Sequence, residues 1–189
     1  MRTISTIRLA TTASVLCLGL GFGPGAAQAT VMVGVAPMYA DKTIVENAVN
    51  SADHETLVAA VKAAGLVDTL SSEGPFTVFA PVDAAFEALP DGTVEGLMQP
   101  ESRDKLTGVL TYHVVPGRLT QDALANLIEA NGGSVELTTA SGGTLMAGMN
   151  GPANIVLTDA AGRTATIGTY DVLQSNGVIH TIDTVLLPQ

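Results

Sequence analysis

Residues 76–86 read FTVFAPVDAAF and change from a strand pattern to a helix pattern within a few positions. The segment Phe76–Phe79 is rich in aromatic and β-branched residues, which favour a strand. Pro81 has no backbone N–H to give to a sheet, so it is expected to end this strand. Asp83 has the place of a helix N-cap, where its carboxylate can accept the backbone N–H of Phe86. The sequence therefore predicts a mostly apolar strand followed at once by a short helix.

Helical periodicity dominates on both sides of this segment, from Asp41 to Asn131. Thr43 and Glu46 have the spacing of a capping box, in which each side chain bonds the backbone of the other residue. Asp53 is expected to cap a helix that stops at Gly65. Two further apolar stripes have helical spacing: Leu106, Val109, Leu110 and His113, and then Leu124, Leu127 and Ile128 after Thr120.

Beyond Gly133 the pattern changes to short β-prone runs separated by turn residues, as in a meandering sheet or sandwich. The pair Asn176-Gly177 suits a type I′ hairpin turn, because both residues tolerate a positive φ. Helices segregated from a largely antiparallel sheet predict an α+β domain, whose sheet the strand Phe76–Phe79 must join. The expected strands are Ser134–Thr138, Thr144–Met149, Asn154–Thr158, Thr164–Ser175 and Val178–Leu187.

Residues 1–29 begin with two positive charges, continue with the apolar run Leu9–Phe22 and end in small residues. This order is typical of a secretory signal peptide, with cleavage expected between Ala29 and Thr30. A membrane anchor is the alternative, but a spanning helix needs about 20 apolar residues and this run is shorter. We therefore expect export to the periplasm or the extracellular space.

Cleavage after Ala29 would leave 160 residues, remove Arg2, Arg8 and Cys17, and change the net charge from −10 to −12. An exported chain without cysteine has no disulfide, so its core alone must hold it together. Residues 30–40 are expected to form a short linker or N-terminal arm, and residues 41–189 a single domain. Since no second apolar stretch approaches spanning length, the mature chain is expected to have no membrane span.

The charge balance narrows the class of partner. The whole chain has 18 Asp and Glu residues against 8 Lys and Arg. So few cations release few counterions from a phosphate backbone, which argues against a nucleic-acid-binding protein.

Signatures of catalysis are absent from the sequence that would remain after cleavage. His54, His113 and His180 are far apart and form no His-x-x-x-His pair, and there is no nucleophile elbow or phosphate loop. Most carboxylates stand at expected helix starts, although a pair for glycoside hydrolysis is not formally excluded. We expect no enzyme, no bound metal and no cofactor. His54, near a helix start, is expected to be exposed.

Three segments, taken together and in this order, resemble the fasciclin (FAS1) domain family. They are residues 76–86, residues 112–117 (YHVVPG) and residues 176–188 (NGVIHTIDTVLLP). The resemblance implies a wedge-shaped β-sandwich with flanking helices in the N-terminal half, which agrees with the α+β expectation. Val82 departs from the family, which usually has a hydroxyl residue there. Within these segments, Pro81, Asp83, His180 and Asp183 are expected to have structural roles.

Tyr112 and His113 have two interpretations. The resemblance implies a role in adhesion, because this segment is implicated in adhesion in fasciclin proteins of animals. The residues themselves favour a structural role, since His113 shares an apolar stripe with Val109 and Leu110 and is expected to be buried and hydrogen-bonded.

By resemblance, the protein is expected to be a non-catalytic module for cell adhesion or matrix contact, with a surface protein or glycan as partner. The chain has no Arg-Gly-Asp triplet and no glycosylation sequon, which fits a bacterial exported protein better than an animal integrin ligand. A carrier of a small apolar ligand such as a carotenoid is the alternative, and a hydrolase is the third.

Overall fold

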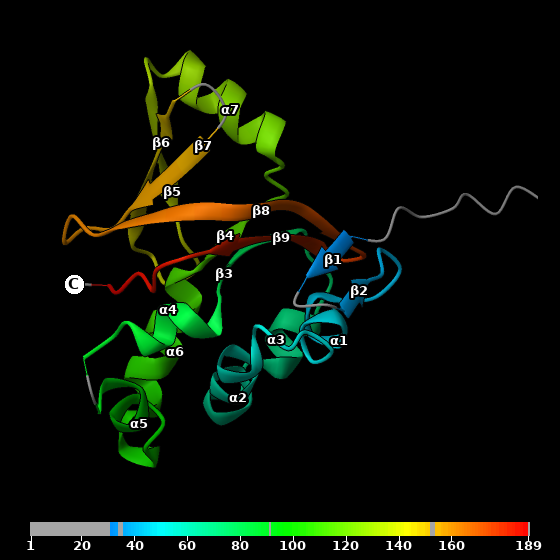
Figure 1. Ribbon diagram of the computed structural model, residues 1–189, viewed down its shortest axis with the longest axis vertical. Helices are drawn as coiled ribbons and strands as arrows, with labels where there is room; N and C mark the ends of the chain where they lie inside the picture. Colours follow the sequence, from blue (N-terminus) through cyan, green and yellow to red (C-terminus); the bar gives the residue numbers. More distant parts are fainter. Residues whose placement is uncertain (1–30, 34–35, 91, 152–153, 189) are drawn as a thin grey trace, which may run out of the picture.

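The computed structural model describes residues 31–33, 36–90, 92–151 and 154–188. Helices α1 to α6 gather on one side of the strands at the centre of the molecule, and α7 lies apart from them, against β5 and β6 (Figure 1). The helical elements are α1 (Ile44–Ala48), α2 (Glu55–Ala64), α3 (Val67–Ser71), α4 (Asp83–Glu87), α5 (Thr93–Leu97), the 3-10 helix η1 (Pro100–Ser102), α6 (Arg103–Tyr112) and α7 (Gln121–Ala130).

Seven strands form one sheet in the order β4-β3-β9-β8-β7-β6-β5, and β1 pairs separately with β2. All neighbours are antiparallel except β3 and β9, which are parallel. The strands are β1 (Val31–Val33), β2 (Ala36–Met38), β3 (Phe76–Pro81), β4 (Val114–Pro116), β5 (Ser134–Thr138), β6 (Thr144–Asn150), β7 (Asn154–Thr158), β8 (Thr164–Gln174) and β9 (Gly177–Ile182).

The sheet curls until its two edges approach each other. Ala140, just after β5, donates its N–H to the carbonyl of Val114 in β4 over 2.7 Å. The result is a nearly closed sheet flanked by helices, which confirms the α+β class expected from the sequence. The strand expected at 76–79 joins the sheet between β4 and β9 and extends to Pro81.

Strand β3 contributes to two hydrophobic cores. Val78 and Ala80 lie in the core beneath the helices, whereas Phe79 lies in the core between the sheet and α7. Successive side chains of a strand point to opposite faces, so a strand between two cores must be apolar on both. This accounts for the nearly continuous apolar run that marks β3 in the sequence.

The stretch expected to be a short linker or N-terminal arm, residues 30–40, contains two short strands among its described residues. Strands β1 and β2 pair antiparallel, and Val33 and Met38 are buried in the helical core. They share this core with Ile44 of α1 and Leu57 of α2. Residues 1–29, and with them the expected cleavage between Ala29 and Thr30, lie outside the described residues.

Asp83 caps a different helix from the one that the sequence predicts. Its carboxylate accepts the N–H groups of Glu55 (3.1 Å) and Thr56 (2.9 Å), the first residues of α2. Helix α4 has Val82 as its N-cap, without a side-chain hydrogen bond. The Asp83 N–H also donates to the carbonyl of Asp53 over 2.9 Å. Asp83 therefore joins the end of β3 to the start of α2. It provides the cap of α2 that the sequence predicts for Asp53.

Replacing Asp83 by Ala should lower the free energy of unfolding by about 1 kcal/mol, the usual effect of losing an N-cap. Chemical denaturation measures it. Asp53→Ala is the matched control, because the exposed Asp53 side chain makes no capping hydrogen bond, and it should change stability by less than half as much. The reverse order of the two effects would contradict the assignment.

The turn before β9 also differs from the expected type I′ turn, since neither Asn176 nor Gly177 has a positive φ. Gly177 is instead the first residue of β9, where an added Cβ would lie 2.2 Å from the carbonyl oxygen of Phe76. The Asn176 side chain accepts the N–H of Ile44 (3.0 Å) and donates to the carbonyls of Leu70 and Ser72. Close packing, rather than turn geometry, explains this Asn-Gly pair.

Candidate functional site

The three segments that carry the family resemblance meet in the interior. Phe79 in β3 donates its N–H to the carbonyl of His113 (2.9 Å), and Leu186 beyond β9 donates its N–H to the His113 ring (3.0 Å). Phe79 also pairs with His180 across the parallel strands, and their rings stack at 5.8 Å. Segments far apart in the sequence thus form one hydrogen-bonded centre.

His113 is buried, with 3% of its surface exposed. Its Nδ1 lies 2.8 Å from the carbonyl of Val109, and its Nε2 accepts the Leu186 N–H, so Nδ1 is the protonated nitrogen. Burial lowers the pKa of His113 to about 4, although the hydrogen bond to Val109 and the charge of Asp159 act in the opposite direction. The ring is therefore neutral at pH 7, with both nitrogens occupied by the backbone.

Tyr112 is also buried, with 1% exposed. Its hydroxyl donates to the carbonyl of Thr144 (2.6 Å) and accepts the N–H of Ala160 (3.3 Å). It is the last residue of α6 and His113 is the C-cap, so strand β4 begins at Val114. Neither member of the candidate adhesion pair reaches the surface.

His180 is fully buried in β9. Its Nε2 lies 2.7 Å from the carbonyl of Leu119, and its Nδ1 accepts the N–H of Asp171 over 3.3 Å. Burial lowers the pKa of His180, against the hydrogen bond to Leu119 and the charge of Asp171. Asp171 in turn accepts the N–H of Gln121 at the start of α7 (2.8 Å), so this histidine lies where β8, β9 and α7 are joined.

Pro81 and Asp183 likewise serve local structure. Pro81 is the last residue of β3 and pairs with Ile182. The Asp183 carboxylate accepts the N–H of Thr166 (2.8 Å) and the hydroxyl of Thr184 (3.0 Å), which fixes the chain as it leaves β9.

Asp159 is a buried carboxylate that the sequence did not single out. One oxygen accepts the N–H groups of Ala161 and Arg163, both at 2.9 Å. The other accepts Arg163 Nε (2.7 Å) and the N–H of Leu187 (3.2 Å). Burial raises the pKa of Asp159, but these hydrogen bonds and the Arg163 charge outweigh it and hold the pKa below its ordinary value. The group fastens the β7–β8 turn to the C-terminal segment.

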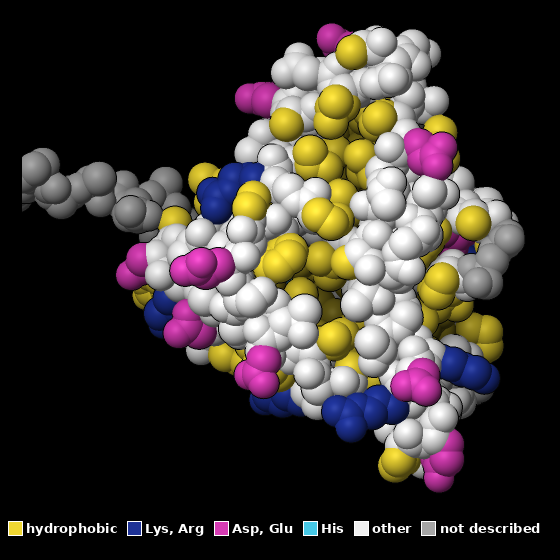
Figure 2. Space-filling view, turned by 180° about the vertical axis from the view of Figure 1, so that it is seen from behind, with side chains coloured by type: hydrophobic (Ala, Val, Ile, Leu, Met, Phe, Trp, Pro, Cys, Tyr) yellow, Lys and Arg dark blue, Asp and Glu magenta, His cyan; other side chains and the backbone are white. Residues whose placement is uncertain are grey.

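His54 is buried, with 3% exposed, which corrects the expectation that it is exposed. It is the N-cap residue of α2, but its ring turns inward, with Nδ1 2.8 Å from the Ser51 hydroxyl. Among the described residues, Nε2 has no hydrogen-bond partner. Burial lowers its pKa, whereas the charges of Asp83 and Asp53 and the backbone of Ala80 act to raise it. No imidazole is visible on the face drawn in Figure 2.

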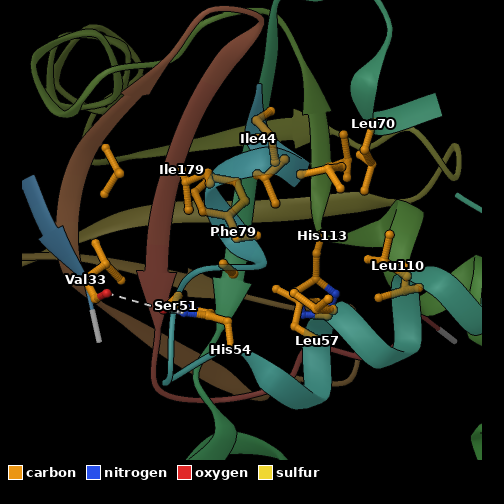
Figure 3. A pocket seen from close by; sticks show the side chains of 18 of the residues that line it. Val33, Ile44, Ser51, His54, Leu57, Leu70, Phe79, Leu110, His113 and Ile179 are labelled. Carbon is orange, nitrogen blue, oxygen red and sulfur yellow. Dashed lines mark hydrogen bonds between the residues drawn. The ribbon is translucent and has the colours of Figure 1, made fainter. Parts of the chain in front are cut away.

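A small apolar cavity of about 60 Å³ lies beside His54 and His113. In Figure 3 the labelled side chains come from helices and strands and surround a common space, with His54 and His113 at its border. Apolar side chains form nearly all of the wall, among them Val33, Ile44, Leu57, Leu70, Leu110 and Ile179; the polar side chains are Ser51, His54, His113 and Lys62.

Within the described residues, no group of three His, Cys, Asp or Glu side chains is placed to hold a metal ion. In the same part of the chain, no helix has the length and apolar composition needed to cross a membrane.

A model of the Fasciclin domain matches residues 52–188. The chain belongs to the fasciclin domain family. It is 46% identical over 160 residues to Protein sll1483 of Synechocystis sp., covering 84% of this chain and 81% of that protein. It is 43% identical over 145 residues to the uncharacterized protein sll1735 of the same organism, covering 76% of this chain and 96% of that protein.

Among solved structures, this fasciclin domain is similar to a FAS1 domain pair from the insect cell adhesion molecule fasciclin I. The TM-score is 0.69 with 20% sequence identity, and the match covers 77% of this chain and 51% of that chain. At this identity the likeness concerns the fold, and it confirms the FAS1 fold expected from the three segments.

Proposed function

We propose that this fasciclin domain is a non-catalytic binding module that mediates contact with a cell surface or extracellular matrix. The observation that carries the proposal is the family membership, with a fold shared by a domain pair of an insect cell adhesion molecule. The burial of every histidine supports a binding rather than a catalytic role, because none is accessible to a substrate at the surface.

Export belongs to the same proposal. It rests on the order of charged, apolar and small residues in 1–29, with cleavage after Ala29 and release into the periplasm or the extracellular space. The partner is a surface or matrix protein or a glycan. Its surface is not strongly acidic, since it would be repelled by the cleaved chain, whose net charge is −12.

Contact must be made by residues other than Tyr112 and His113, because both are buried. Exposed large hydrophobic side chains are typical of interaction surfaces. Three of them lie on or next to β1, β2 and α1, where the Asn47 side chain in α1 accepts the N–H of Tyr39 and donates to its carbonyl. We call them the N-terminal hydrophobic surface: Met32, Tyr39 and Val49.

The double change Tyr39→Ser and Val49→Ser should reduce attachment of cells to a surface coated with the protein by several-fold, since a few apolar anchors carry most of the energy of an interface. Counting attached cells against coating density measures the effect. Leu127→Ser with Met146→Ser is the matched control: these side chains are 37% and 41% exposed, against 43% for Tyr39 and 48% for Val49, but lie on α7 and β6. Equal loss in both double variants would contradict the assigned surface.

The carotenoid alternative receives no support from the cavity. Cavities of about 150 Å³ hold a molecule the size of benzene, and the space beside His54 is about 60 Å³. A long polyene therefore does not fit inside it.

Figure 2 shows a band of hydrophobic side chains across one face with acidic side chains around it, and this surface is open to a partner rather than enclosed.

A further inference from the structure

The cavity beside His54 has an apolar interior and an accessible rim. Its inner wall is formed by buried side chains of β3, β9 and the helices, among them Val78, Ile179 and Leu57. Half-buried side chains of α2 and α3, Val58 and Val67, also line it, and so does the exposed Lys62. The cavity thus extends from the core to side chains at the surface of α2 and α3.

The charges around the cavity are not balanced. Of the charged residues on α1, α2 and α3, which are Glu46, Glu55, Lys62 and Asp68, only Lys62 lines the cavity. Glu46 is engaged by the backbone and hydroxyl of Thr43. In the described part of the chain the salt bridge joins Arg163 to Asp159, so Lys62 has no ion-pair partner there. The rim therefore presents one unpaired cation next to an apolar space.

We propose that the cavity binds a short-chain monocarboxylic acid, with the apolar chain inside and the carboxylate at Lys62. This combination complements the apolar wall and the single positive charge of the rim. Each buried methylene raises affinity about fourfold, but the volume of about 60 Å³ admits only a few carbons. This binding is independent of the adhesive function proposed above.

His54 helps to decide the orientation of the ligand. Its Nε2 is a buried polar atom with no hydrogen-bond partner in the described part of the chain, so a carboxyl group entering first would have a hydrogen-bonding group near it. Burial keeps His54 neutral at pH 7, however, and an ionised carboxylate is costly to bury without an opposite charge. At the rim the carboxylate stays hydrated and faces an ammonium group, which favours the orientation with the head at Lys62.

The test titrates butyrate and 1-butanol, which share a chain of a few carbons and differ in charge, into the full chain at pH 7, and follows amide chemical shifts by NMR. Both should bind, and butyrate more tightly. Lys62→Gln should weaken butyrate about two- to fivefold, as expected for an exposed ion pair, and leave 1-butanol unchanged. Raising the salt concentration should have the same selective effect.

Val58→Phe fills the rim and should abolish binding of both probes, whereas Ala59→Phe, on the same helix but outside the lining, should not. Denaturation curves show whether each variant folds, and if Val58→Phe does not, the comparison of Lys62→Gln between the two probes still decides. Absence of saturable binding, or binding that Lys62→Gln does not change, would overturn the proposal. A loss of butyrate binding in His54→Gln but not in Lys62→Gln would overturn the orientation.

Discussion

Replacing His113 by Ala should lower the free energy of unfolding by about 3 kcal/mol. The substitution leaves a cavity at a position that is 97% buried and strands the N–H of Leu186, which has the ring as its acceptor. A stranded buried donor costs about 1–3 kcal/mol, and the lost packing adds to this. Chemical denaturation at pH 7 measures the effect.

The same residue predicts a dependence of stability on pH. The pKa of His113 is about 4 in the folded chain, below its ordinary value of 6.5, so the unfolded state binds the proton more readily. Stability should therefore fall as the pH drops from about 6.5 to 4, by at most about 1.4 kcal/mol per pH unit for one proton. In His113→Ala one proton fewer is taken up on unfolding in this range, so stability should depend less steeply on pH. Part of the dependence should remain, because the pKa values of His54 and His180 are also lowered.

A structural role and an adhesive role give different results for this variant. If His113 is structural, His113→Ala should be less stable but attach cells normally at a temperature where it remains folded. Unchanged stability together with lost attachment would show that the adhesion motif acts through this residue, contrary to its position in the interior.

Local chemistry was sufficient to predict much of the fold. The capping box of Thr43 and Glu46, the helix after Thr120 and the end of α2 at Gly65 occur as expected, because each depends on residues within one turn of a helix. The bounds of β5 and β7 also match, since alternation and turn residues determine them. The resemblance of three segments to the fasciclin family predicted the FAS1 fold.

The features that the sequence did not reveal depend on contacts between distant segments. Asp83 and Asp53 both have good local capping positions, but only the end of β3 brings a carboxylate to the start of α2. His54 is polar and near a helix start, yet its ring is covered by elements that arrive from elsewhere in the chain. Asp159 offered a usable signal, because an Asp that opens a short loop between strands often accepts the N–H two residues on.

Asp159→Ala should destabilise the protein by about 3 kcal/mol, because it removes four acceptor contacts and leaves the N–H of Leu187 without a partner inside the structure. The side chain is fully buried and its partner Arg163 only partly exposed, so solvent replaces these hydrogen bonds poorly. The pKa of Asp159 is below its ordinary value of 3.8, so this contribution is complete above that pH and is lost as the pH falls through the lower, folded value. Denaturation at pH 7 and at stepwise lower pH measures both effects.

Asp159→Asn distinguishes the contribution of the turn from that of the link to the C-terminal segment. An amide oxygen can still accept the N–H groups of Ala161 and Arg163, but an NH₂ group in place of the second oxygen faces two donors, Arg163 Nε and the Leu187 N–H. We therefore expect Asn to cost less than Ala while raising amide exchange at Leu187, because the segment after β9 loses its anchor. The acid-induced loss of stability below pH 3.8 should be smaller in both variants, whereas the loss between pH 6.5 and 4 should remain, since it comes from the histidines. A variant that kept the whole acid response below pH 3.8 would show that another carboxylate causes it.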